Sequence, residues 1–155
     1  MSHRQGRSHI ECFTDGAVSN NGNPNARGGF GIHFPGGEMR DVKGPLPGPV
    51  QTNNRAEYHA IIEAQNRARS AGYDSIKIST DSQVASRSVN EWLPKWKENG
   101  FRTSTGRPVA DQDLLKRMEK NMRTIKTEVS HVRGHGENAS NKMADSLARQ
   151  GRRNQ

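Results

Sequence analysis

The sequence has little of what disulfide-bonded, membrane-spanning or secreted proteins need. Cys12 is the only cysteine, which excludes an internal disulfide and a cysteine-based zinc site and fits a reducing, intracellular compartment. No apolar run approaches the roughly 18–20 residues of a membrane span, so we expect no membrane partner. Residues 1–8 lack the apolar core of a secretory signal, and nothing distinguishes nucleus, mitochondrion and cytoplasm.

Apolar residues are also scarce. Hydrophobic residues make up 30% of the chain and aromatic residues 5%, which approaches the composition of disordered proteins. Basic and acidic residues are interspersed, however, and several segments show regular periodicity. We therefore predict one folded domain over residues 9–151, between an N-terminal tail at 1–8 and a C-terminal tail at 152–155.

The charge is strongly one-sided. Lys and Arg number 24 against 16 Asp and Glu, a formal net charge of +8. Such an excess favours a polyanionic partner, nucleic acid before an anionic membrane. Because many basic proteins use their charge only for solubility, the motifs must decide whether this charge indicates nucleic-acid binding.

Apolar periodicity predicts an α/β fold. Alternating residues predict strands at 9–14, 28–34, 38–43, 75–80 and 125–132. Helical spacing predicts helices at 52–71, 82–90, 110–122 and 141–150, with a further short helix after Asn90. The first three strands should form an antiparallel meander and the last two, reached through helices, should add in parallel. We expect a mixed five-stranded sheet flanked by helices.

Four acidic residues occupy informative places in this pattern. Asp15 and Asp81 follow the first and fourth strands, whose carboxyl ends should meet at one edge of the sheet. Glu57 falls in the first two turns of the helix at 52–71, and Asp145 lies near the buried side of the last helix. Carboxylates in contact repel one another, and a divalent cation such as Mg²⁺ relieves that repulsion. Taken singly, Asp15 could instead form a turn, and Asp81 could cap the following helix.

The motifs around these acids resemble those of type 1 ribonuclease H, in the version found as the catalytic domain of the eukaryotic enzyme. They run in order from about residue 9 to 151: Asp15-Gly16, Gln51 to Glu57, Thr80-Asp81-Ser82, Gly134-His135 and Asn141 to Asp145. Each motif is short, and the specificity lies in their order along the whole chain.

The resemblance implies an endonuclease that hydrolyses the RNA strand of RNA–DNA hybrids. Two Mg²⁺ ions, with Mn²⁺ as a possible substitute, would be held by the four acids and would leave 5′-phosphate and 3′-hydroxyl ends. The implied metal ligands are Asp15, Glu57, Asp81 and Asp145. His135 would aid proton transfer or product release, although Gly-His-Gly is also an ordinary flexible turn.

The resemblance also implies residues that contact each strand. Asn21, Asn53 and Asn54 would reach the 2′-hydroxyls that distinguish RNA from DNA, or else serve only loop and cap formation. The residues implied on the DNA strand are Thr52, Trp92, Trp96 and Ser104. The two tryptophans lie four residues apart among basic side chains, so a helix would place them on one face, although tryptophans at this spacing are often simply core.

Two positions depart from this family. Val50 stands where close relatives carry an arginine of a DNA-phosphate pocket, and Asp111 stands where they carry an asparagine. Both changes should weaken the hold on that phosphate, unless Arg107 or Lys116 substitutes. A catalytically silent hybrid-binding module and a junction resolvase are the alternative functions, and we expect the chain to be a monomer.

Overall fold

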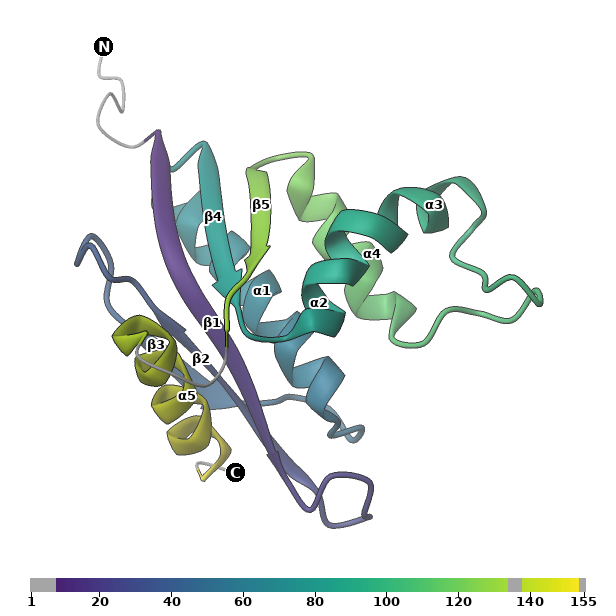
Figure 1. Cartoon of the computed structure of the whole chain (residues 1–155), viewed down its shortest axis with the longest axis horizontal. Coiled ribbons are helices and arrows are strands. Elements are labelled where there is room, and N and C mark those ends of the chain that lie inside the picture. Colours follow the sequence, from purple (N-terminus) through teal and green to yellow (C-terminus); the bar gives the residue numbers. More distant parts are fainter. Residues whose placement is uncertain (1–7, 134–137, 154–155) are drawn as a thin grey trace.

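The computed structural model describes residues 8–133 and 138–153 (Figure 1). Its five strands form one sheet in the order β3-β2-β1-β4-β5. The strands are β1 (His9–Ser19), β2 (Arg27–His33), β3 (Val42–Pro45), β4 (Ser75–Thr80) and β5 (Lys126–His131). The β1–β2 and β2–β3 pairs are antiparallel, and the β1–β4 and β4–β5 pairs are parallel. The predicted mixed α/β sheet is confirmed.

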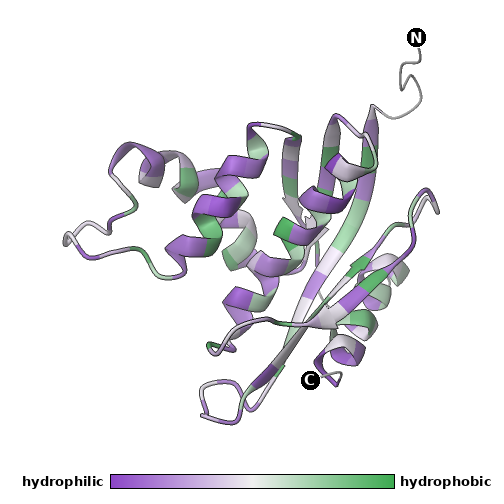
Figure 2. Cartoon of the chain, turned by 180° about the vertical axis from the view of Figure 1, so that it is seen from behind, coloured by the Kyte–Doolittle hydropathy of each residue, from purple (hydrophilic) through white to green (hydrophobic). Residues whose placement is uncertain are grey.

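Helices cover both faces of this sheet. The helices are α1 (Asn53–Ser70), α2 (Gln83–Arg87), α3 (Leu93–Glu98), α4 (Gln112–Met122) and α5 (Ala139–Arg152). Helices α1 and α4 lie on one face and α5 lies on the other (Figures 1 and 2). Within residues 8–133 and 138–153, no helix is long and apolar enough to cross a membrane.

The apolar residues are concentrated between the sheet and α1. Ile10, Cys12, Ile76 and Ile78 of β1 and β4 are buried against alanines and isoleucines of α1, among them Ala60 and Ile61. Figure 2 shows that much of the outward surface of the helices is hydrophilic. This small number of apolar residues therefore suffices to hold a folded domain together, because nearly all of them face one core.

The close packing of α5 depends on two glycines of β2. A Cβ on Gly29 would lie 2.5 Å from the carbonyl oxygen of Ala148, and one on Gly31 would lie 2.6 Å from the carbonyl oxygen of Ala144. Main-chain atoms cannot yield as a flexible side chain can, so only glycine allows α5 to approach the sheet this closely.

Two strand boundaries differ from the prediction. Strand β1 continues through Asp15 to Ser19 because its pairing with β2 extends from Phe13 to Ser19. Asp15 therefore lies inside β1 and does not close it. The third strand begins only at Val42 and includes Pro45, which an edge strand tolerates because it has no partner on its outer side.

The helices also depart from prediction in two places. The segment predicted as one helix at 82–90 is α2 followed by a π-helical turn, Ser88–Trp92, that leads directly into α3. Asn90 does not cap α3; its side-chain amide donates to the carbonyl of Val129 at 2.9 Å and ties this turn to β5. The apolar spacing of the predicted helix at 141–150 places Met143 and Leu147 on its inner face. On α5, however, Met143 is exposed, whereas Ala144, Ala148 and Gly151 are buried, since small residues permit the close approach to β2.

Candidate active site

Strand pairing places Asp15 and Asp81 beside each other. The parallel β1–β4 register ends at the pair Thr14 and Thr80, so the next residue on each strand is an aspartate. Beyond this point β1 continues along β2, while β4 ends and the chain turns into α2. The two carboxylates therefore lie where the neighbouring strands separate, as the parallel pairing predicts.

Glu57 reaches the same point from α1. Thr52 caps this helix by accepting a hydrogen bond from the Arg55 N–H at 3.2 Å, and Glu57 follows one turn later. Gly16 lets the helix approach β1, since a Cβ there would lie 2.6 Å from the Ala56 Cβ and 2.8 Å from the Glu57 nitrogen. One carboxylate oxygen each from Asp15, Glu57 and Asp81 lie within 4.8 Å of one another.

Asp145 approaches this cluster from the opposite face of the sheet. It lies on α5, about two-fifths exposed, and forms an ion pair with Arg149 one turn later. Its carboxylate is near enough to Asp15 to raise the pKa of that residue through hydrogen bonding and charge. Asp145 therefore borders the three-acid cluster and is partly neutralised by Arg149.

Asp81 is oriented by a neighbour that the sequence pattern did not single out for this role. The side-chain amide of buried Asn141 on α5 contacts the Asp81 carboxylate at 3.5 Å. The helix after Asp81 is capped by Ser82, whose hydroxyl accepts from the Ala85 N–H at 3.0 Å, so the cap interpretation of Asp81 is wrong. The available signal was the spacing of Asn141 and Asp145, four residues apart on one helix face.

The electrostatics of the cluster favour a cation. Burial, followed by the charges of Glu57 and Asp81, raises the pKa of Asp15 far above its ordinary value. Burial and the charge of Asp81 also raise the pKa of Glu57, while a hydrogen bond from the Gly16 N–H opposes that rise. The Glu57 Oε1 atom is buried and has no hydrogen-bond partner among the residues that the structure describes. Mutually repelling carboxylates with an unpartnered buried oxygen fit a divalent cation that prefers oxygen ligands.

Comparison with known proteins shows the family to which the chain belongs. The sequence profile of the RNase H family matches residues 7–153. The chain belongs to the ribonuclease H family. It is 38% identical to ribonuclease H of Schizosaccharomyces pombe over 90% of this chain and 51% of that protein. It is 37% identical to ribonuclease H of Cyanothece sp. over 90% of this chain and 86% of that protein.

The fold agrees with the same family. The chain superimposes on the solution structure of the PFV RNase H domain with a TM-score of 0.76 and 26% identity, covering 97% of this chain and 98% of that domain. The chain thus spans about half the length of the fission yeast relative but nearly the whole of this ribonuclease H domain.

The asparagines that the ribonuclease H resemblance implies on the RNA side lie near the start of α1. The Asn21 side-chain oxygen accepts from the Asn53 N–H at 3.3 Å, which ties the loop after β1 to this helix. Asn21, Asn53 and Asn54 are all exposed, and the cap of α1 is Thr52. Asn53 and Asn54 therefore precede Glu57 by about one turn of α1, and the cap interpretation of Asn53 is wrong.

The residues implied on the DNA side are split between two regions. Trp92 ends the π-helical turn and Trp96 lies on α3, which projects sideways from the sheet (Figure 1), and their ring centroids are 5.8 Å apart. Both are half-buried, and Trp96 also packs against the core, so it has a structural contribution as well. Ser104 is exposed in the loop that follows, whereas Thr52 lies at the start of α1.

The departure at Asp111 has a structural consequence. Its carboxylate accepts from Arg55 at 3.1 Å, and Asp113 accepts from the same guanidinium at 2.8 Å. Val50, the other departure, is exposed. Lys116, one of the two bases named as substitutes at the phosphate pocket, lies over the Phe101 ring at 5.5 Å. The Arg55 charge is therefore compensated by two acids.

The implied His135 lies outside the described residues.

Proposed function

We propose that this ribonuclease H hydrolyses the RNA strand of RNA–DNA hybrids in the presence of two Mg²⁺ ions, leaving 5′-phosphate and 3′-hydroxyl ends. The three-carboxylate cluster of Asp15, Glu57 and Asp81 carries this proposal. Membership of the ribonuclease H family and relatives named ribonuclease H support it. Mn²⁺ offers the same oxygen chemistry and would be a substitute.

The chain's own residues would hold and orient the reacting groups. Asp15, Glu57, Asp81 and Asp145 would bind the ions, with Asn141 keeping the Asp81 carboxylate in place. When bound, such ions polarise the scissile phosphate and neutralise charge on the attacking and leaving oxygens. His135 is proposed to transfer a proton or help the product leave.

Substrate recognition would come from both strands. The exposed asparagines Asn21, Asn53 and Asn54 would contact 2′-hydroxyls, which only the RNA strand carries. The tryptophan pair would pack against the deoxyribose of the other strand, where a 2′-hydroxyl would collide. Thr52 and Ser104 would contact DNA phosphates, with a hold weakened by the Asp111–Arg55 pair.

The chain is proposed to act as a monomer in a reducing, intracellular compartment. The support for the compartment is the single cysteine, Cys12, which is fully buried among apolar neighbours and whose pKa burial raises. A single cysteine can form no internal disulfide, so this chain needs no oxidising compartment to fold.

The test of the function is cleavage of an end-labelled RNA–DNA hybrid with Mg²⁺ and with EDTA. An RNA duplex, a DNA duplex, a four-way DNA junction and single strands serve as matched substrates, and binding of the hybrid is measured in parallel. We expect cutting of the RNA strand in the hybrid only, and only with Mg²⁺. Tight binding of the hybrid without cutting would support a silent binding module, and preferential cutting of DNA junctions would support a resolvase.

A further inference from the structure

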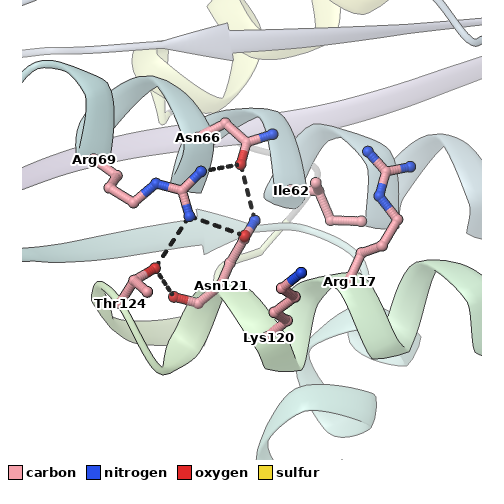
Figure 3. A pocket seen from close by; sticks show the side chains of 7 residues that line it. All are labelled: Ile62, Asn66, Arg69, Arg117, Lys120, Asn121 and Thr124. Carbon is pink, nitrogen blue, oxygen red and sulfur yellow. Dashed lines mark hydrogen bonds between the residues drawn. The ribbon is translucent and has the colours of Figure 1, made fainter.

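A groove between α1 and α4 is lined by three basic side chains, three neutral polar ones and one isoleucine, and by no acidic one (Figure 3). It encloses about 270 Å³, and its lining residues are Ile62, Asn66, Arg69, Arg117, Lys120, Asn121 and Thr124. Ile62 and Asn121 are buried, and the three cations are exposed. The groove starts five residues beyond Glu57 on α1, about one and a half helical turns from the acid cluster.

One cation of this groove is held in place by neutral partners. The Arg69 guanidinium donates to Asn121 Oδ1 at 3.3 Å, to Thr124 Oγ1 at 3.1 Å and to Asn66 Oδ1 at 3.3 Å. Asn121 in turn donates to Asn66 Oδ1 at 3.1 Å, so the polar side chains form one network. Because each acceptor is uncharged, the network fixes the guanidinium and leaves its positive charge uncompensated.

The other two cations extend from α4 toward α1 (Figure 3). In the part of the chain that the structure describes, neither Arg117 nor Lys120 forms an ion pair. The acidic residue next to Ile62 on α1, Glu63, lies 3.8 Å from Arg67 and 4.0 Å from His59. Three positive charges therefore converge on the groove with no acid among its lining residues.

We infer that this groove binds the phosphodiester backbone of a nucleic acid, at a second site outside the acid cluster. Arginine and lysine around a hydrogen-bonding floor are the side chains that bind phosphate. A second depression shares Asn66 with the groove and is lined by Asn66, Arg67, Ser70 and Ala71 with no acid, so the surface suits a strand more than a single ion. The depression that shares Arg69 and Thr124 carries the acidic Asp74, so a phosphate backbone would leave the groove on the Asn66 side. The choice of nucleic acid as the polyanion rests on the proposed function.

The test follows backbone amide shifts of the protein in EDTA, so that no cleavage occurs. Inorganic phosphate and a short DNA duplex are titrated separately at constant ionic strength. We expect both to shift the amides of Asn66, Asn121 and Thr124. The variant Arg117→Gln/Lys120→Gln leaves the Arg69 network intact and should lose these shifts, with phosphate affinity lowered about tenfold or more.

A matched control removes two exposed cations elsewhere. Neither Arg40 nor Arg153 has an ion pair within the described ranges, and Arg40→Gln/Arg153→Gln should retain the groove shifts. Shifts with phosphate but none with the duplex would overturn the assignment to nucleic acid, and no shift with either would overturn the site. Equal loss of the groove shifts in both double variants would overturn the site, because the effect would then come from the net charge of the protein.

Hybrid cleavage, measured on the same wild-type preparation, separates this inference from the proposed function. Cleavage without groove shifts would refute the second site alone. Groove shifts without cleavage of any substrate would refute the proposed function and leave phosphate binding by the groove standing.

Discussion

The acid cluster is a source of instability when no cation is bound. Asp15 is 4% exposed and faces Glu57 and Asp81, so the folded protein retains a proton that the unfolded chain releases at neutral pH. A carboxyl with a pKa raised on folding costs no stability below its unfolded pKa, near 4. Its cost grows as the pH rises from there toward the folded pKa. The cluster therefore lowers the stability of the metal-free protein and raises its affinity for a cation.

Asp15→Asn should raise the stability of the metal-free protein at neutral pH. The amide is neutral in both states, so it removes the cost of holding a proton on Asp15 that the unfolded chain releases, and we expect a Tm rise of about 5 °C in EDTA. The gain should shrink as the pH is lowered through 4, because the unfolded wild-type chain then takes up the same proton. Thermal unfolding across this pH range measures it, with the exposed Asp74→Asn as a control that changes little. A destabilised Asp15→Asn would contradict the repulsion.

At the scale of the elements, the site exists because two helices, α1 and α5, converge on the point where β1 and β4 separate. The decisive contact is the start of α1 against Gly16, because it sets the distance of Glu57 from Asp15. Asn141 makes the corresponding link from α5 to Asp81. The geometry of the acids thus depends on helix packing as much as on the strands.

Gly16→Ala should separate Glu57 from the aspartates. The added methyl meets main-chain atoms of Ala56 and Glu57, so α1 must shift, at a cost of about 1–3 kcal/mol of stability. At temperatures where the variant is fully folded, the loss of stability alone would leave the cleavage rate unchanged. The cleavage rate should nevertheless fall there, because Glu57 is displaced. Adding Ala56→Gly should not restore activity, because the backbone contacts remain. Full activity and an unchanged Tm would show that α1 does not set the site.

Trp96→Ala should weaken hybrid binding about fivefold, which corresponds to the loss of one aromatic contact. Since Trp96 also packs on the core, some stability will be lost, and Trp96→Phe should recover most of it. Fluorescence anisotropy with a labelled hybrid, well below the Tm of each variant, separates the two effects. If Trp96→Ala binds the hybrid as wild type does, the residue is only part of the core.

Much of this element-level picture could be predicted from the sequence. Periodicity locates the strands and helices, and the rule for parallel pairing is enough to bring Asp15 and Asp81 together. The extent of β1 was missed because Asp15-Gly16 has the composition of a turn, whereas pairing with β2 carries the strand on. The role of Asn141 depends on how α5 crosses the sheet, which local sequence does not encode. The strand-contacting residues and His135 remain predictions.

The whole molecule carries a formal net charge of +8. Within it, Asp15, Glu57 and Asp81 form a compact acidic cluster. The net positive charge attracts a polyanion to the molecule as a whole. A cation is needed at the acid cluster, where a phosphate of that polyanion would meet carboxylates. Metal dependence is thus the central claim about function.

The most direct test is the initial rate of RNA-strand cleavage in a hybrid, measured against Mg²⁺ concentration for wild type and Asp81→Asn. Losing this ligand should lower the rate on the order of a thousandfold at every Mg²⁺ concentration, because several kcal/mol of transition-state stabilisation are lost. The variant should remain folded and still bind the hybrid. Wild-type turnover by Asp81→Asn, or wild-type cleavage that persists in EDTA, would contradict the account.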